Sequence, residues 1–75
     1  MLKVGSLYQR IDPMCGSIRT SSGIYIIKLH DIVVVLNYIG KKDNCDEWQV
    51  LSTTGEFGVY TINSTLIPML WKELA

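Results

Sequence analysis

Short runs of β-branched and aromatic residues alternate with polar segments along the chain. The runs lie at residues 23–29, 32–39, 48–52 and 57–61, and residues 32–39 are the most hydrophobic of them. Runs of this length and branching favour extended strands over helices. Residues 3–11 add a first strand that bends at its glycine.

The polar segments between these runs have the composition of turns and loops. Residues 13–23 are rich in Ser and Gly and predict a long loop, and residues 41–47 predict a charged loop. Residues 30–31 supply a turn, because an Asp side chain can hydrogen-bond its own backbone two residues on. Residues 53–56 contain one glycine and join two strands closely, which predicts a β-hairpin.

The C-terminal segment, residues 66–74, follows a turn at residues 63–65 and has Pro68 near its start. Proline removes a backbone donor, so it fits either an edge strand or a single helical turn. We expect a closing edge strand. The whole pattern predicts an all-β fold, a small barrel of five or six short antiparallel strands in one domain spanning residues 1–75.

Length and composition restrict the class of protein. A chain of 75 residues with 48% hydrophobic and 19% charged residues fits one folded domain. Its core is small, so self-association or docking on a partner is an expected source of stability. Seven basic residues balance seven acidic ones, which disfavours a surface that neutralises nucleic-acid phosphates. No apolar leader and no long apolar run is visible, which predicts a soluble, cytoplasmic protein with no membrane partner.

Cysteine and histidine spacing does not indicate a reactive centre. Cys15 and Cys45 match neither a CxxC pair nor a zinc knuckle, and a reducing compartment favours free thiols over a disulfide between them. His30 is the sole histidine and has no nucleophile or carboxylate beside it. The three residues could converge as metal ligands, but their spacing matches no ligand hairpin. We expect no metal, no cofactor and no enzymatic activity.

A known family resembles the middle and late parts of the chain. Residues 31–36 (DIVVVL), a charged loop, Trp48, residues 53–60 (TTGEFGVY) and Asn63 follow one another. This order resembles the second half of an SH3-like barrel, and covers about half of the chain. Residues 3–8 (KVGSLY) are similar to the opening of free-standing SH3-like barrels from bacterial and bacteriophage proteins. The resemblance implies a small barrel that binds proteins.

The chain departs from the family at the positions that bind ligands. Peptide-binding SH3 domains hold proline-rich segments with several aromatic rings and a proline. Trp48 matches one of these rings, but Thr61 stands where the proline would be and Ser64 near the position of a tyrosine. Gln9 and Arg10 replace an acidic and an aromatic residue. The comparison implies a retained barrel without recognition of proline-rich motifs.

Trp48 and its neighbours are the first candidates for partner binding. Asp46 and Glu47 precede Trp48, so their carboxylates could steer a cationic partner onto the indole ring. Alternatively, Trp48 belongs to the barrel core, since tryptophan is common in both places. Tyr8 and Tyr60 complete the predicted partner-binding set.

The chain also has more large aromatic rings than the interior of a small barrel, which is filled by layers of small aliphatic side chains, would hold. The rings in question belong to Tyr8, Tyr25, Tyr38, Tyr60 and Trp71. We expect some of them outside, where they would form an interface. The alternative is that exposed rings are scattered and contact no partner.

Two functions are consistent with these patterns. The first is a non-catalytic protein-protein interaction module that binds a protein partner or a second copy of itself. By resemblance it would be a bacteriophage accessory protein, associated with the virion or with a host factor. The alternative is a nucleic-acid-binding barrel of the KOW or Tudor kind, with aromatic rings stacked on bases. It requires the basic residues to share one face: Lys3, Arg10, Arg19, Lys28, Lys41, Lys42 and Lys72.

Overall fold

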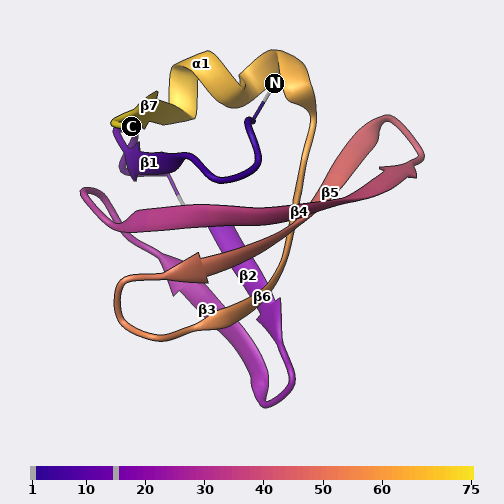
Figure 1. Ribbon diagram of the computed structural model, residues 1–75, viewed down its shortest axis with the longest axis horizontal. Coiled ribbons are helices and arrows are strands. Elements are labelled where there is room, and N and C mark those ends of the chain that lie inside the picture. The colour runs from indigo at the N-terminus through magenta and orange to yellow at the C-terminus, as the bar shows by residue number, and fades with distance from the viewer. Residues whose placement is uncertain (1, 15) are drawn as a thin grey trace.

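A computed structural model of the chain describes residues 2–14 and 16–75 and shows one antiparallel sheet. The sheet has seven strands in the order β3-β2-β6-β5-β4-β1-β7 and curls into a half-barrel (Figure 1). The strands are β1 (Leu7–Arg10), β2 (Gly16–Thr20), β3 (Gly23–Ile27), β4 (Ile32–Lys42), β5 (Cys45–Ser52), β6 (Phe57–Ile62) and β7 (Trp71–Glu73). The predicted all-β class is confirmed, with one strand more than the upper expectation.

The three central strands form a meander whose side chains alternate between the inside and the outside of the curl. Along β5, Trp48 and Val50 point inward and are buried, and the residues that alternate with them are partly exposed. On β4, Val33 and Val35 are buried in the same way. The predicted hairpin over residues 53–56 joins β5 to β6, and its glycine adopts a φ of 91° that other residues rarely reach.

The predicted loop at residues 41–47 is instead a tight hairpin. Strand β4 continues to Lys42 and β5 begins at Cys45, leaving only Asp43 and Asn44 as the turn. Asp43 takes a φ of 57°, a left-handed conformation that Asp and Asn tolerate better than most residues. Strand β4 runs past Gly40, where an irregularity in the β4–β5 register accommodates the glycine.

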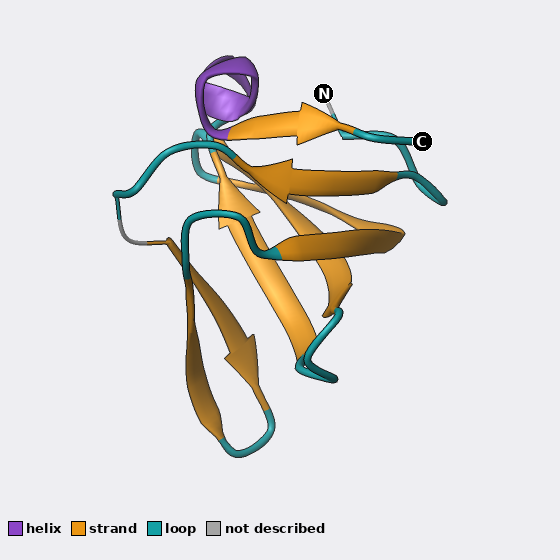
Figure 2. Cartoon of the chain, turned by 90° about the vertical axis from the view of Figure 1, so that its left-hand side faces the viewer, coloured by secondary structure: helices purple, strands orange, loops and turns teal. Residues whose placement is uncertain are grey.

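The predicted loop at residues 13–23 contains strand β2, which pairs with β3 and crosses onto β6. The β2–β3 hairpin extends away from β1, β7 and the helix (Figure 2). Only Ile18 of β2 is fully buried, and polar neighbours on either side of it hide the strand signal in the sequence. The crossing requires Gly58 on β6, because a Cβ there would lie 2.2 Å from the carbonyl oxygen of Arg19.

The C-terminal segment combines both predicted structures. A 3-10 turn η1 (Ser64–Leu66) leads into a short helix α1 (Ile67–Leu70), with Pro68 in its first turn. Strand β7 then pairs with β1 at the edge of the sheet, as expected for a closing strand. Asn63 caps the 3-10 turn by accepting a hydrogen bond from the backbone N–H of Thr65.

The core holds more large rings than the sequence predicted. Its buried hydrophobic members are Leu2, Tyr8, Ile18, Ile27, Val33, Val35, Trp48, Val50, Tyr60, Ile62, Ile67 and Trp71. Tyr38 and Tyr25 keep part of their surface exposed. The expectation that some rings lie outside therefore holds for Tyr38, whereas Tyr25 packs against the core and Tyr8, Tyr60 and Trp71 lie within it.

Candidate functional site

Most of the predicted partner-binding residues lie inside the curled sheet. Their exposed fractions are 4% for Tyr8, 5% for Asp46, 2% for Trp48 and 3% for Tyr60, whereas Glu47 is partly exposed. Trp48 and Tyr60 are paired across β5 and β6, and Tyr8 lies on β1. Trp48 thus takes the core position that was its alternative interpretation, and this set offers little surface for direct contact with a partner.

Asp46 ties the β4–β5 hairpin to the 3-10 turn. One carboxylate oxygen accepts a hydrogen bond from the hydroxyl of Tyr38 at 2.7 Å, and the other accepts one from the hydroxyl of Ser64. The bond from Ser64, the bond from Tyr38 and the nearby charge of Lys41 hold the pKa of Asp46 below its usual range, against the effect of desolvation. The same contact with Asp46 raises the pKa of Tyr38. Each carboxylate oxygen of Asp46 thus holds a side chain of the same domain, which indicates a structural role for this network.

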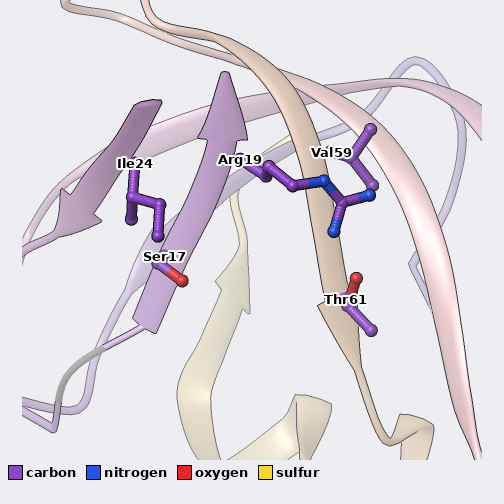
Figure 3. A pocket seen from close by; sticks show the side chains of 5 residues that line it. All are labelled: Ser17, Arg19, Ile24, Val59 and Thr61. Carbon is purple, nitrogen blue, oxygen red and sulfur yellow. The ribbon is translucent and has the colours of Figure 1, made fainter. Parts of the chain in front are cut away.

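Glu47 belongs to the outer face of the sheet. It accepts a hydrogen bond from Thr61 at 3.0 Å and lies 3.6 Å from a guanidinium nitrogen of Arg19. A shallow hollow of about 200 Å³ lies beside this pair, lined by Ser17, Arg19, Ile24, Val59 and Thr61 (Figure 3). Figure 3 shows the Arg19 side chain extending across toward the strand that carries Val59 and Thr61. The hollow is small and open, so it offers little enclosed surface to a ligand.

A second cluster, centred on Arg10, lies in the buried interior of the curled sheet. Arg10 is only 1% exposed, and its guanidinium lies 5.2 Å from the ring centre of Trp71. Nη1 of Arg10 donates to the hydroxyl of Tyr60 at 3.2 Å, and Nε1 of Trp71 donates to the same oxygen at 3.1 Å. The rings of Tyr60 and Trp71 meet edge to face with centres 5.6 Å apart. These contacts fix the guanidinium in one orientation.

This cluster forms the floor of a larger groove, which we name the Arg10 groove. It has a volume of about 460 Å³, and apolar atoms make up most of its exposed wall. Its lining residues are Arg10, Asp12, Met14, Gly16, Ser17, Tyr60, Thr61, Ile62, Leu66, Met69 and Leu70. Met14 is 70% exposed and Met69 61%, so two flexible apolar side chains stand at the surface of the groove.

Sequence reasoning placed only Tyr60 of this groove among the partner contacts. Its parts come from the end of β1 and the segment after it, the start of β2, the end of β6 and the helical segment, so no local motif marks it. One signal was available in the first strand. Side chains two residues apart on a strand point to the same face, so Arg10 points inward together with Tyr8. A charged residue on the inward face of a strand is unusual.

The remaining sequence candidates do not gather into a centre. Cys15 lies outside the described residues, and the thiol of Cys45 is free. Among the residues described, no group of three or more His, Cys, Asp or Glu side chains could hold a metal ion. His30 occupies an exposed turn with a φ of 76°. In residues 2–14 and 16–75, no helix combines the length and apolar character that crossing a membrane requires.

The basic residues are spread over several elements. Arg10 is buried, Lys3 lies 3.5 Å from Glu73, and Arg19 is paired with Glu47. Lys41 and Lys42 lie at the far end of β4, away from Lys28 in the turn after β3. This distribution gives no specific support to the nucleic-acid alternative.

Comparisons of the chain with protein-family models, with curated protein sequences and with solved structures found no match.

Proposed function

We propose that the chain is a non-catalytic SH3-like interaction domain that binds a segment of another protein in the Arg10 groove. Strand order supports the SH3-like part of the proposal. The order β7-β1-β4-β5-β6, with a 3-10 turn before the last strand, resembles that of an SH3-like barrel. In this reading, the β2–β3 hairpin replaces the long loop that follows the first strand of such barrels.

The observation that carries the binding proposal is the exposure of Met14 and Met69 on an apolar groove. Binding sites in proteins are concave and mainly apolar, with a few convergent polar groups. Methionine is common on surfaces that receive other proteins, because its unbranched thioether side chain adapts to the partner. At about 460 Å³ the groove has room for a few side chains of a peptide, rather than for a whole folded surface.

The resemblance to free-standing SH3-like proteins of bacteriophages extends this proposal to a source and a role. It suggests an accessory protein that uses the groove to attach to a virion component or a host factor. This extension has the support of the sequence resemblance alone, and the groove does not depend on it.

Selection of peptides tests the binding proposal. A random peptide library is displayed and panned on the folded domain, and the affinity of each recovered peptide is then measured by fluorescence anisotropy. The double substitution Met14→Ala with Met69→Ala should weaken binding at least about tenfold, since burying one methionine side chain contributes roughly 1.5–3 kcal/mol. Ile24→Ala is the matched control, because Ile24 is 69% exposed and lines the other hollow.

Two results would overturn the proposal. One is a panning experiment that recovers no peptide above the background of the support. The other is a set of peptides whose affinity is unchanged by the double methionine substitution.

A further inference from the structure

We infer that the Arg10 groove recognises an acidic side chain of the partner, flanked by apolar residues; this inference rests on the proposed function and names the chemistry of its ligand. The first observation is that Arg10 is a buried cation that forms no ion pair with a carboxylate of the described residues. Its guanidinium donates to three neutral oxygens: the carbonyl of Asp12 at 3.3 Å, the carbonyl of Met14 at 3.1 Å and the hydroxyl of Tyr60 at 3.2 Å. The ion pairs between described residues are Lys3 with Glu73 and Arg19 with Glu47.

Buried charges in proteins are ordinarily paired, because removing an ion from water is costly. A guanidinium has five N–H donors in a planar fork that suits the two oxygens of a carboxylate. Three neutral acceptors satisfy part of that capacity and the Trp71 ring stabilises the cation, but none of these groups carries a negative charge. The groove floor therefore carries a positive charge that an incoming anion would neutralise.

Tyr60 adds a second donor at the same place. Its hydroxyl oxygen accepts hydrogen bonds from both Arg10 and Trp71. A phenolic oxygen that accepts twice has only its O–H left to offer, and the structure gives that O–H no acceptor among the described residues. The floor thus presents N–H and O–H donors together, which is the complement of a carboxylate rather than of an ammonium or guanidinium group.

Gly16 borders the guanidinium. A Cβ at this position would lie 3.1 Å from Nη2 and 3.2 Å from Nη1 of Arg10, so any larger residue would crowd the charged group. Around this point the walls are apolar: Met14, Leu66 and Met69 are exposed. A ligand that places one charge on the floor and apolar groups on the walls would match both features.

An internal Asp or Glu fits this arrangement better than a chain terminus. Arg10 is 1% exposed, so its charge lies below the surface on which Met14 and Met69 stand. A side chain can reach down from a backbone that runs along the surface, and the residues on either side of it then contact the methionines. A terminal carboxylate would require the backbone itself to descend into the groove.

Among the described residues that line the groove, Asp12 is the one with a carboxylate, and it allows a sharp test. Its Oδ1 accepts a hydrogen bond from the backbone N–H of Met14 at 2.7 Å, a role that asparagine can fill. For an acidic ligand Asp12 is a like charge, so Asp12→Asn should raise affinity. For a cationic ligand the same substitution should lower it.

The experiment uses the peptides recovered by panning, made with acetylated and amidated ends, and measures their affinity by fluorescence anisotropy. We expect the peptides to share an Asp or Glu with apolar neighbours. Replacing that acidic residue by Gln or Asn should weaken binding at least about tenfold, because hydrogen bonds to charged groups are the strong ones. Asp12→Asn in the domain should strengthen binding by a factor of about two to five, as for a partly exposed charge pair.

Three outcomes would overturn the inference. It is contradicted if the recovered peptides lack acidic residues, or if they bind only with a free C-terminal carboxylate. It is also contradicted if Asp12→Asn in the domain weakens their binding. If such peptides still lose affinity with the double methionine substitution, the proposed function stands and only the ligand chemistry is wrong. If that substitution has no effect on them, the proposed function fails as well.

Discussion

Arg10 and Tyr60, fifty residues apart in the sequence, are joined inside the sheet by a hydrogen bond of 3.2 Å from Nη1 to the tyrosine hydroxyl. The bond links the first strand to β6, and these strands are separated in the sheet by β4 and β5. The edge strands β3 and β7 are not paired with each other, so the sheet stays open between its two ends. The Arg10–Tyr60 bond and the bond from Trp71 of β7 to Tyr60 connect the two sides of the curl in its interior. The Arg10–Tyr60 bond also orients the charged group at the floor of the Arg10 groove.

The two tryptophans should respond differently to the same substitution. Both are buried, but Nε1 of Trp71 donates to Tyr60, whereas Nε1 of Trp48 is buried without a partner among the described residues. Trp71→Phe should therefore lower the free energy of unfolding by about 1 kcal/mol more than Trp48→Phe, the usual contribution of one hydrogen bond.

Urea unfolding followed by far-UV circular dichroism measures both variants without depending on tryptophan fluorescence. Each variant serves as the control of the other, because the loss of ring volume is the same. A Trp48→Phe variant at least as destabilised as Trp71→Phe would contradict the assignment of the unpaired indole N–H.

Gly58→Ala should severely destabilise the fold. Its Cβ would lie 2.2 Å from the backbone carbonyl oxygen of Arg19 and 2.8 Å from Cγ2 of Ile18, so β2 would have to move away from β6. Overpacking of this kind costs about 1–3 kcal/mol or more. Thermal unfolding measures the effect.

Gly16→Ala is the control for Gly58→Ala, because its nearest neighbours are the side-chain atoms of Arg10 at 3.1 Å or more. The Arg10 side chain would have to give by only a few tenths of an ångström, far less than the backbone at Gly58, so Gly16→Ala should be the milder change. Equal melting temperatures for Gly58→Ala and the wild type would show that β2 does not cross β6 as described.

Acid should weaken the fold through Asp46. Hydrogen bonds from Ser64 and Tyr38 lower its pKa in the folded state, so the ionised form stabilises the protein. This contribution is fully present above the unfolded-state pKa of about 4 and is lost as the pH falls through the lower folded-state pKa. The melting temperature of the wild type should therefore fall more steeply below about pH 4 than that of Asp46→Asn.

The asparagine variant keeps an acceptor oxygen but cannot titrate, and the other carboxylates are common to both proteins. Melting curves recorded between about pH 2 and pH 6 make the comparison. Parallel curves for the two proteins would mean that Asp46 does not contribute to acid sensitivity.

The sequence predicted most strands correctly, because the residues that mark a strand or a turn are neighbours in the sequence. Alternation along residues 48–52 and the glycine turn before β6 were sufficient for the meander. Strand β2 was missed because Ser17 and Arg19 surround its single buried residue, and its pairing depends on a close approach at Gly58 far along the chain.

The candidate site was beyond the reach of the same reasoning. The order of residues around Trp48 resembles that of SH3-like barrels, but such an order does not tell whether the indole ring points inward or outward. In the structure the ring of Trp48 points inward and is buried. The Arg10 groove joins Arg10, Met14, Tyr60 and Met69 from separate elements, so it exists only after folding. The only local sign of the groove was the position of Arg10 on the same face of the first strand as Tyr8.

Chemical-shift mapping tests the central claim most directly. Amide signals of the folded domain are recorded by two-dimensional NMR while a peptide recovered by panning is added. The account predicts that the largest shifts fall on the non-proline residues of 10–14, 16–17, 60–62 and 66–70, around the Arg10 groove, and that the turn at Asp43 and Asn44 is unaffected. Shifts concentrated on the outer hollow around Ile24, or on the β4–β5 turn, would contradict it.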